Sequence, residues 1–288
     1  MNIMKRIVLA IAIFAFVSLS SQAQTAHSLF WRSDSLQVKE LFTDQTGQFN
    51  KVGHHGPAVE NSHMGLRIYF NDSGAIDVYS KSGEKMELLD YLWYPSQELQ
   101  VSEGAGFDHY IVGKTVGLGG FALWDGSQEI KLKPTKGQSA RVGSTKKGSF
   151  AEMTVYGVEY NSELVDICIR VDVEKGSRDA YVTATELGGK NVQFLTGVNY
   201  HEGQTIFYDE GHIGVWGVHK GDKAPVPIPL GAGLWYNPKH FKAPEKTANM
   251  IRVISKPAKS IKTKIVAAST KEKELNTEEK FREYIIQK

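Results

Sequence analysis

Apolar and polar residues alternate along most of the chain between residues 64 and 270. The longest alternating stretch runs from Glu163 to Glu174, turns, and returns as Ala180–Glu186. A period of two places successive side chains on opposite faces of a strand, so this stretch is predicted to form a β-hairpin. Further strands are predicted at residues 66–70, 75–79, 110–112, 120–124, 129–133, 150–160, 192–200, 206–208, 213–218, 233–236, 251–255 and 261–268.

Helix patterns are few. The clearest follows Asn276, which can cap a helix with Glu279 as its capping-box partner, and Phe281, Tyr284 and Ile285 then share one face. A weaker helix is predicted at residues 35–42, and the Lys-rich stretch 256–264 is predicted to be a solvated strand edge or loop. About 14 strands without intervening helices predict an all-β antiparallel sandwich with a short C-terminal helix. A mutarotase-type supersandwich fits this pattern as well as a jelly roll does.

The first 23 residues have the pattern of a secretory signal peptide. A basic start at Lys5 and Arg6 precedes the apolar stretch 7–19 and a small-residue cleavage site ending at Ala23. The alternative is a short membrane anchor, but the apolar stretch is short for a membrane span. We therefore expect a periplasmic or secreted protein in which residues 24–288 form a single domain.

The charge balance limits the expected classes of partner, and the cysteine content limits the expected disulfides. The chain has 34 Lys+Arg and 32 Asp+Glu, so removing Lys5 and Arg6 with the leader leaves 32 of each. This balance gives no support for a nucleic-acid partner, or for a membrane partner after cleavage. The lone cysteine, Cys168, excludes an intrachain disulfide and is predicted to be a small buried hydrophobe. The oligomeric state is left open.

Candidate chemistry begins just before residues 66–70. Two imidazoles, His54 and His55, precede Glu60 and Asn61 within eight residues. They are candidates for a general base and for substrate binding. The alternative is a polar loop in which Glu60 and Asn61 satisfy backbone groups. A zinc site is not predicted, because neither an HExxH motif nor a cysteine pair is present.

Polar side chains alternate through the predicted strands 66–70 and 75–79. Arg67, Asp77, Tyr79 and Lys81 can line a groove on one face of the sheet, and Arg67 can bind a carboxylate with two hydrogen bonds. The alternative is the ordinary wet face of a sandwich.

A glycine-rich segment follows at residues 103–120. Its Gly113-Lys114-Thr115 sequence resembles the end of a phosphate-binding loop, but Asp108 stands where that loop requires a glycine, so ATP binding is rejected. Asp108, His109 and Tyr110 are candidates to act on a substrate; the alternative is a turn with buried polar groups.

Further candidates lie near the ends of two predicted strands. His201 and His219 each follow an apolar run where a loop begins, and Trp216 offers an aromatic face for a sugar ring. For Trp216 the alternative is core packing. No motif supports Ca²⁺ or another cofactor, so none is expected. No Gly-x-Ser-x-Gly motif is present either, so serine hydrolysis is not supported.

Several strings of residues together resemble the DUF4861 family. They are residues 56–61, 67–70, 76–81, 104–115, 117–120 and 216–219. The resemblance implies an exported Bacteroidota protein associated with polysaccharide utilisation, with a β-sandwich fold. It also implies elimination chemistry on uronic-acid-containing oligosaccharides.

The residue types fit that chemistry. β-Elimination from a uronate needs a group that neutralises the carboxylate, a base for the C5 proton and an acid for the departing oxygen. Arg67 or Asn61 can do the first, a neutral histidine (His54, His55, His201 or His219) the second, and Tyr110 or a second histidine the third. Two alternatives remain open. One is a glycoside hydrolase with a carboxylate pair chosen from Glu60, Asp77 and Asp108, and the other is a non-catalytic glycan-binding protein.

Overall fold

A computed structural model describes residues 24–92, 95–220 and 227–288. The described residues form eighteen strands and two α-helices, so the all-β prediction is confirmed. The strands build two stacked layers, one a large sheet and the other a pair of smaller sheets. The predicted signal peptide, residues 1–23, lies outside the described residues.

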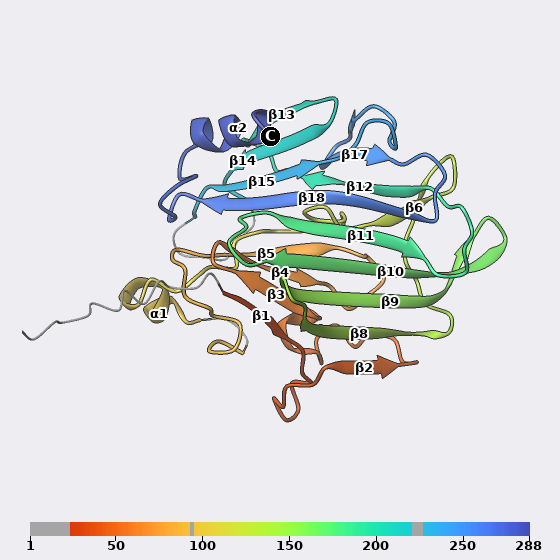
Figure 1. Cartoon of the computed structure of the whole chain (residues 1–288), viewed down its shortest axis with the longest axis horizontal. Helices are drawn as coiled ribbons and strands as arrows, with labels where there is room; N and C mark the ends of the chain where they lie inside the picture. Colours follow the sequence, from red (N-terminus) through yellow and green to blue (C-terminus); the bar gives the residue numbers. More distant parts are fainter. Residues whose placement is uncertain (1–23, 93–94, 221–226) are drawn as a thin grey trace, which may run out of the picture.

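The large layer is a nine-stranded antiparallel sheet, seen face-on in Figure 1. In spatial order its strands are β13 (Thr205–Asp209), β14 (His212–Gly217), β15 (Leu230–Trp235), β18 (Ser260–Ser269), β11 (Ala180–Glu186), β10 (Glu163–Glu174), β9 (Gly148–Tyr160), β8 (Gly137–Ser144) and β2 (Glu40–Thr43). The predicted hairpin is β10–β11, with the boundaries expected from its alternation.

The second layer consists of two smaller sheets. One has the order β1 (Thr25–Ser28), β3 (Ala58–Asn61), β4 (Met64–Ile68) and β5 (Ile76–Ser80). The other has the order β16 (Glu245–Lys246), β17 (Met250–Ile254), β12 (Phe194–Asn199), β6 (Ala122–Trp124) and β7 (Glu129–Ile130). Backbone bridges join them, because Gly117 pairs with Ile76 of β5 and Leu118 pairs with Val198 of β12. The glycine-rich segment is therefore the link between the two sheets.

The core lies between the two layers. Along β10, the side chains of Val165, Ile167, Ile169 and Val171 are buried and alternate with partly exposed ones. Burying each such side chain contributes about 1.5–3 kcal/mol, which is how a protein without disulfides can be stabilised. Cys168 belongs to the other, outer face and is only partly buried, so the prediction that it is a core residue is wrong. From Val165 on, the odd-numbered residues of β10 face the core, and residue 168, being even-numbered, faces outward.

Helix α2 (Glu278–Ile286) covers the outer face of β14 and β15, as Figure 1 shows at its upper edge. Its predicted apolar face is confirmed, since Phe281 and Ile285 are buried against Trp216 and Trp235. The cap is Thr277 rather than the predicted Asn276, because the Thr277 side chain accepts the hydrogen bond from the Lys280 amide.

Other local predictions were wrong or only partly right. Residues 35–42 form no helix and instead lead into strand β2, and residues 110–112 form no strand. The Lys-rich stretch 256–264 was predicted in part, because residues 256–259 form a largely exposed loop, whereas residues 260–264 belong to β18 in the interior of the large sheet, between β15 and β11. The short helix α1 (Gln97–Ser102) was not predicted. Among the described residues, no helix is long and apolar enough to cross a membrane.

Candidate functional site

The candidate residues gather on the outer side of the second layer, away from the large sheet. In β4 and β5, Leu66 and Val78 pack into the core, so the alternate residues Arg67 and Asp77 point the other way. Arg67 and Asp77 also face each other across the two strands. The segment around residues 107–111 covers this side, because Phe107 pairs with Ser80 at the end of β5.

Arg67 joins two carboxylates. Its Nη2 donates to Oδ2 of Asp77 and to Oδ1 of Asp108. The Tyr69 hydroxyl also donates to Oδ2 of Asp77, at 2.7 Å. Burial raises the pKa of Asp77 to about 7, against the opposing effect of the Arg67 charge. With two carboxylates on one guanidinium the cluster has no net positive charge, so we assign Arg67 to positioning Asp108 rather than to binding a substrate carboxylate.

Asp108 is the member of this cluster that reaches the surface, with 34% of its side chain exposed, against 1% for Arg67 and 2% for Asp77. A buried cation therefore fixes the position of an accessible carboxylate. This makes Asp108 a group that a ligand can contact directly.

His54 and His55 occupy a short 3-10 turn (Gly53–His55) and have positive φ values of 53° and 62°. Such angles are uncommon outside glycine and persist where packing holds them. His54 is buried and its Nε2 shares a hydrogen bond with the Ser28 hydroxyl at 3.1 Å; burial lowers its pKa to about 3. These contacts favour a structural role for His54. His55 is half-buried, donates from Nδ1 to the Phe49 carbonyl at 3.2 Å, and has a pKa lowered by burial.

Glu60 and Lys81 form a buried ion pair at 3.0 Å. The other carboxylate oxygen of Glu60, Oε1, accepts hydrogen bonds from the Glu87 and Leu88 amides at 2.7 and 2.8 Å. Lys81 also donates to the Asn61 carbonyl at 2.9 Å. These groups are satisfied by protein partners, which matches the alternative of a polar loop that satisfies backbone groups.

Asn61 and Tyr79 are held in the same way. The Asn61 side chain accepts from the His63 and Met64 amides and donates to the Ser177 carbonyl, with all three distances between 2.9 and 3.0 Å. The Tyr79 hydroxyl donates to Glu87 at 2.6 Å. Their substrate-binding roles stay predictions, and we do not include them in the proposed site.

The peptide groups of Ile111 orient two histidines. The Ile111 carbonyl accepts from His201 Nε2 at 2.9 Å, so this nitrogen carries the proton and Nδ1 of the neutral ring is the acceptor. The Ile111 amide donates to His219 Nδ1 at 3.0 Å, so the proton of neutral His219 is on Nε2. Asn199 donates to the same Ile111 carbonyl at 2.8 Å. The backbone of Ile111 thus fixes both tautomers, so that Nδ1 of His201 is an acceptor and Nε2 of His219 is a donor.

His219 is held neutral. Burial, and to a lesser extent the charge of the neighbouring His201, lower its pKa to about 3, with the two ring centroids 4.6 Å apart. A buried imidazole that stays neutral can donate a hydrogen bond without carrying charge.

Tyr110 completes this group. Its ring lies against His219, with centroids 4.4 Å apart, and it is buried. Its hydroxyl has no hydrogen-bond partner among the described residues, although buried tyrosine hydroxyls usually find one. Burial and the charge of Asp77 raise the pKa of Tyr110, so it keeps its proton at neutral pH. Tyr110 thus packs against the histidine pair and lies near enough to Asp77 to feel its charge.

The structure therefore brings Tyr110, His201 and His219 into contact at the segment that also carries Asp108, whereas the ring of His55 lies against Phe49 and Tyr69. Trp216 lies elsewhere, packed beneath α2 against Phe281 at a centroid distance of 5.5 Å. Sequence reasoning missed Tyr69 and Asn199. The parity of Tyr69 with Arg67 was a usable signal, whereas nothing in the sequence linked Asn199 to Ile111.

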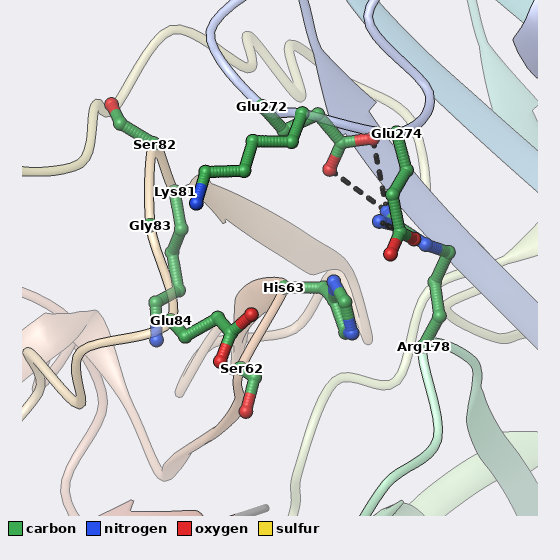
Figure 2. A pocket seen from close by; sticks show the side chains of 10 residues that line it. Ser62, His63, Lys81, Ser82, Gly83, Glu84, Arg178, Glu272 and Glu274 are labelled. Atoms are coloured by element: carbon green, nitrogen blue, oxygen red, sulfur yellow. Dashed lines mark hydrogen bonds and ion pairs between the residues drawn. The ribbon is translucent and has the colours of Figure 1, made fainter. Parts of the chain in front are cut away.

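A separate cavity of about 70 Å³ lies near the turn between β3 and β4 (Figure 2). Arg178 lines one side of it and bonds Glu272 at 2.8 and 3.0 Å and Glu274 at 2.9 Å. His63 points into the same space, where burial and Arg178 lower its pKa. Of the predicted site residues, only Lys81 lines it. Among the described residues, no cluster of three or more His, Cys, Asp or Glu side chains has the geometry to hold a metal ion.

The chain was compared with curated proteins, solved structures and protein families. The comparison with curated proteins found no match. Among solved structures, a 4-alpha-glucanotransferase from Thermococcus litoralis is similar at a TM-score of 0.36 and 11% identity, covering 81% of this chain and 42% of that one. A polysaccharide lyase is similar at a TM-score of 0.34 and 16% identity, covering 78% and 34%. The chain thus spans less than half the length of either.

The family comparison gives a match over nearly the whole chain. Residues 15–288 match the family described as a domain of unknown function, DUF4861. The resemblance noted in the sequence is confirmed, and the chain belongs to the DUF4861 family.

Proposed function

We propose that this protein is an exported carbohydrate-active lyase that performs β-elimination on uronic-acid-containing oligosaccharides. The observation that carries the proposal is the group around Ile111. There, the rings of His201 and His219 contact each other and the Tyr110 ring contacts His219. Asp108, whose carboxylate is partly exposed, lies two residues before Tyr110 in the same segment. These are the donor and acceptor types that elimination requires.

The proposed steps follow from the hydrogen-bonding roles. His201 Nδ1 takes the C5 proton of the uronate, and the electron pair of the C5–H bond becomes the C4–C5 double bond. The C4–O bond breaks, and the departing oxygen takes the proton of the Tyr110 hydroxyl. His219 Nε2–H donates to the uronate carboxylate, where negative charge develops, as a neutral imidazole does for other enolate-like intermediates.

Glycoside hydrolysis is a second candidate, favoured by the carboxylate pair. Asp77 and Asp108 both bond the same Arg67 nitrogen, so their carboxyl groups lie close together. Retaining hydrolases use carboxyl groups about 5–5.5 Å apart, one of them an acid with a raised pKa. Asp77 has a raised pKa, but its carboxylate is already held by Arg67 and Tyr69, whereas the Tyr110 hydroxyl has no partner among the described residues. We therefore rank elimination first.

The test is ultraviolet absorbance while residues 24–288 are incubated with a panel of uronic-acid oligosaccharides. Elimination creates a conjugated unsaturated uronate, so absorbance rises. His201→Gln and Tyr110→Phe are expected to lower the rate by about 10²–10⁴, the usual contribution of one general acid or base.

Matched controls use equivalent residues away from the site. His212→Gln is the control for His201→Gln, because His212 lies at the start of β14, far along the strand from His219. Tyr208→Phe is the control for Tyr110→Phe, because Tyr208 is an exposed residue of β13. Both should keep the wild-type rate. A flat trace with new reducing ends would replace elimination by hydrolysis. A flat trace with a ligand-induced rise in melting temperature would replace it by glycan binding.

A further inference from the structure

A groove of about 310 Å³ lies on the outer face of the nine-stranded sheet, on the opposite side of the sandwich from the candidate site. It runs between the β8–β9 turn, the end of β10, and the outward side chains of β11 and β18. Its lining residues include Lys146, Lys147, Asp172, Tyr181 and Lys262. Helix α2 covers β14 and β15 and leaves this part of the face open.

The lysines around the groove exceed the carboxylates. Lys146, Lys147 and Lys262 line it, and Lys175 lies beside Lys147, whose carbonyl accepts from the Lys175 amide at 2.9 Å. All four are exposed. The mature chain has equal numbers of acidic and basic residues, so this excess is a local feature and not a consequence of overall charge.

The two carboxylates of the groove are already paired. Arg170 holds Asp172 with hydrogen bonds of 2.8, 2.9 and 3.1 Å, and Lys147 pairs with Glu174 at 3.6 Å. Lys146, Lys175 and Lys262, in contrast, have no ion-pair partner within the described ranges of the chain. The ammonium groups of Lys146 and Lys262, which line the groove, are thus available to an anionic ligand, and Lys175 lies next to the groove through its backbone contact with Lys147.

The groove also contains an aromatic ring. Tyr181 projects outward from β11, and the Lys262 ammonium lies 3.9 Å from its ring centroid. An aromatic ring with flanking cations suits a sugar that carries a carboxylate, because the ring contacts the apolar face of the sugar and the lysines pair with its charge. A neutral glycan would leave the lysines unused.

We propose that this groove is a second, non-catalytic binding site for uronate polymers. It would hold a polyanionic chain on the outer face while the site on the second layer acts on an end or branch. The proposal rests on the charge and shape of the groove and does not require the reaction to be an elimination.

The test is gel retardation of residues 24–288 in gels containing polygalacturonate, with dextran as the neutral control. Polygalacturonate should retard the wild-type protein and dextran should not, and added salt should reduce the retardation because exposed charges are screened. The variant Lys146→Ala/Lys175→Ala/Lys262→Ala should bind polygalacturonate on the order of tenfold more weakly, since each exposed ion pair contributes little alone. Lys242→Ala, an exposed lysine before β16, is the matched control and should bind as wild type does.

A second readout separates this site from the catalytic one. The triple variant should keep the wild-type melting temperature and the wild-type rate on short oligosaccharides, because its lysines are exposed and lie on the opposite face. Equal retardation of the triple variant and the wild type would overturn the proposal, as would equal retardation of the wild type by dextran. If no substrate is eliminated but the triple variant loses retardation, the proposed reaction fails and the groove stands.

Discussion

Two tyrosines on the outer side of the second layer, the partly buried Tyr69 and the buried Tyr110, are predicted to respond differently to the same substitution. The Tyr69 hydroxyl donates to the Asp77 carboxylate at 2.7 Å, whereas the Tyr110 hydroxyl has no partner among the described residues. Replacing tyrosine with phenylalanine removes only the hydroxyl in each case. The comparison therefore isolates what each hydroxyl contributes to folding.

The magnitudes follow from these contacts. A hydrogen bond to a charged group contributes about 1.5–3 kcal/mol, so Tyr69→Phe should lower the free energy of unfolding by about 2 kcal/mol. For a domain of this size that corresponds to a fall in melting temperature of roughly 4–8 °C. Burying a hydroxyl without a partner costs about 1–3 kcal/mol, so Tyr110→Phe should leave stability unchanged or raise it.

Urea denaturation and thermal melting of the two variants measure this difference. If Tyr110→Phe were destabilised as much as Tyr69→Phe, its hydroxyl would have a structural partner and the reasoning would be refuted. If Tyr110→Phe is as stable as the wild type, any loss of activity in that variant reports on chemistry and not on folding.

Three further predictions follow from the buried charges. Burial raises the pKa of Asp77 to about 7, so the folded state binds the Asp77 proton more tightly than the unfolded state does. As the pH rises from about 4 to 7, the free energy of unfolding should therefore fall more for the wild type than for Asp77→Asn. Parallel pH profiles of the two proteins would contradict this. The pKa of His219 is lowered to about 3, so its ring should not titrate between pH 5 and 8 in an NMR titration, whereas a midpoint near 6.5 would show a solvated ring. Lys81→Met leaves Glu60 as an uncompensated buried carboxylate, so the free energy of unfolding measured in urea should fall by about 3–5 kcal/mol. A stable variant with only a raised KM would instead make Lys81 a substrate-binding residue.

Alternation identified the hairpins and the sandwich because burial repeats at the period of a strand. It failed where tertiary contacts decide the structure. Residues 110–112 are as apolar as a strand, but Ile111 uses both its amide and its carbonyl on His219, His201 and Asn199 instead of on a neighbouring strand. The short strands β1, β3 and β16 have too few residues to show a period.

The sequence predicted the kinds of side chain at the candidate site, but only some of the residues that form it. His201, His219 and Tyr110 were selected from separate parts of the sequence, and the fold brings them together. Glu60, Asn61 and Lys81 looked equally suitable, because sequence does not reveal whether a polar side chain already has a buried partner. Asn199 was missed for the same reason, since its role depends on a carbonyl 88 positions away.

The central claim is that the protein breaks a bond by elimination. The most direct measurement is mass spectrometry of the products after incubation of residues 24–288 with uronic-acid oligosaccharides in oxygen-18-enriched water. Elimination adds no water across the broken bond, so the account predicts unsaturated products without the heavy isotope. Saturated products that carry oxygen-18 at a new reducing end would contradict it and assign the reaction to hydrolysis.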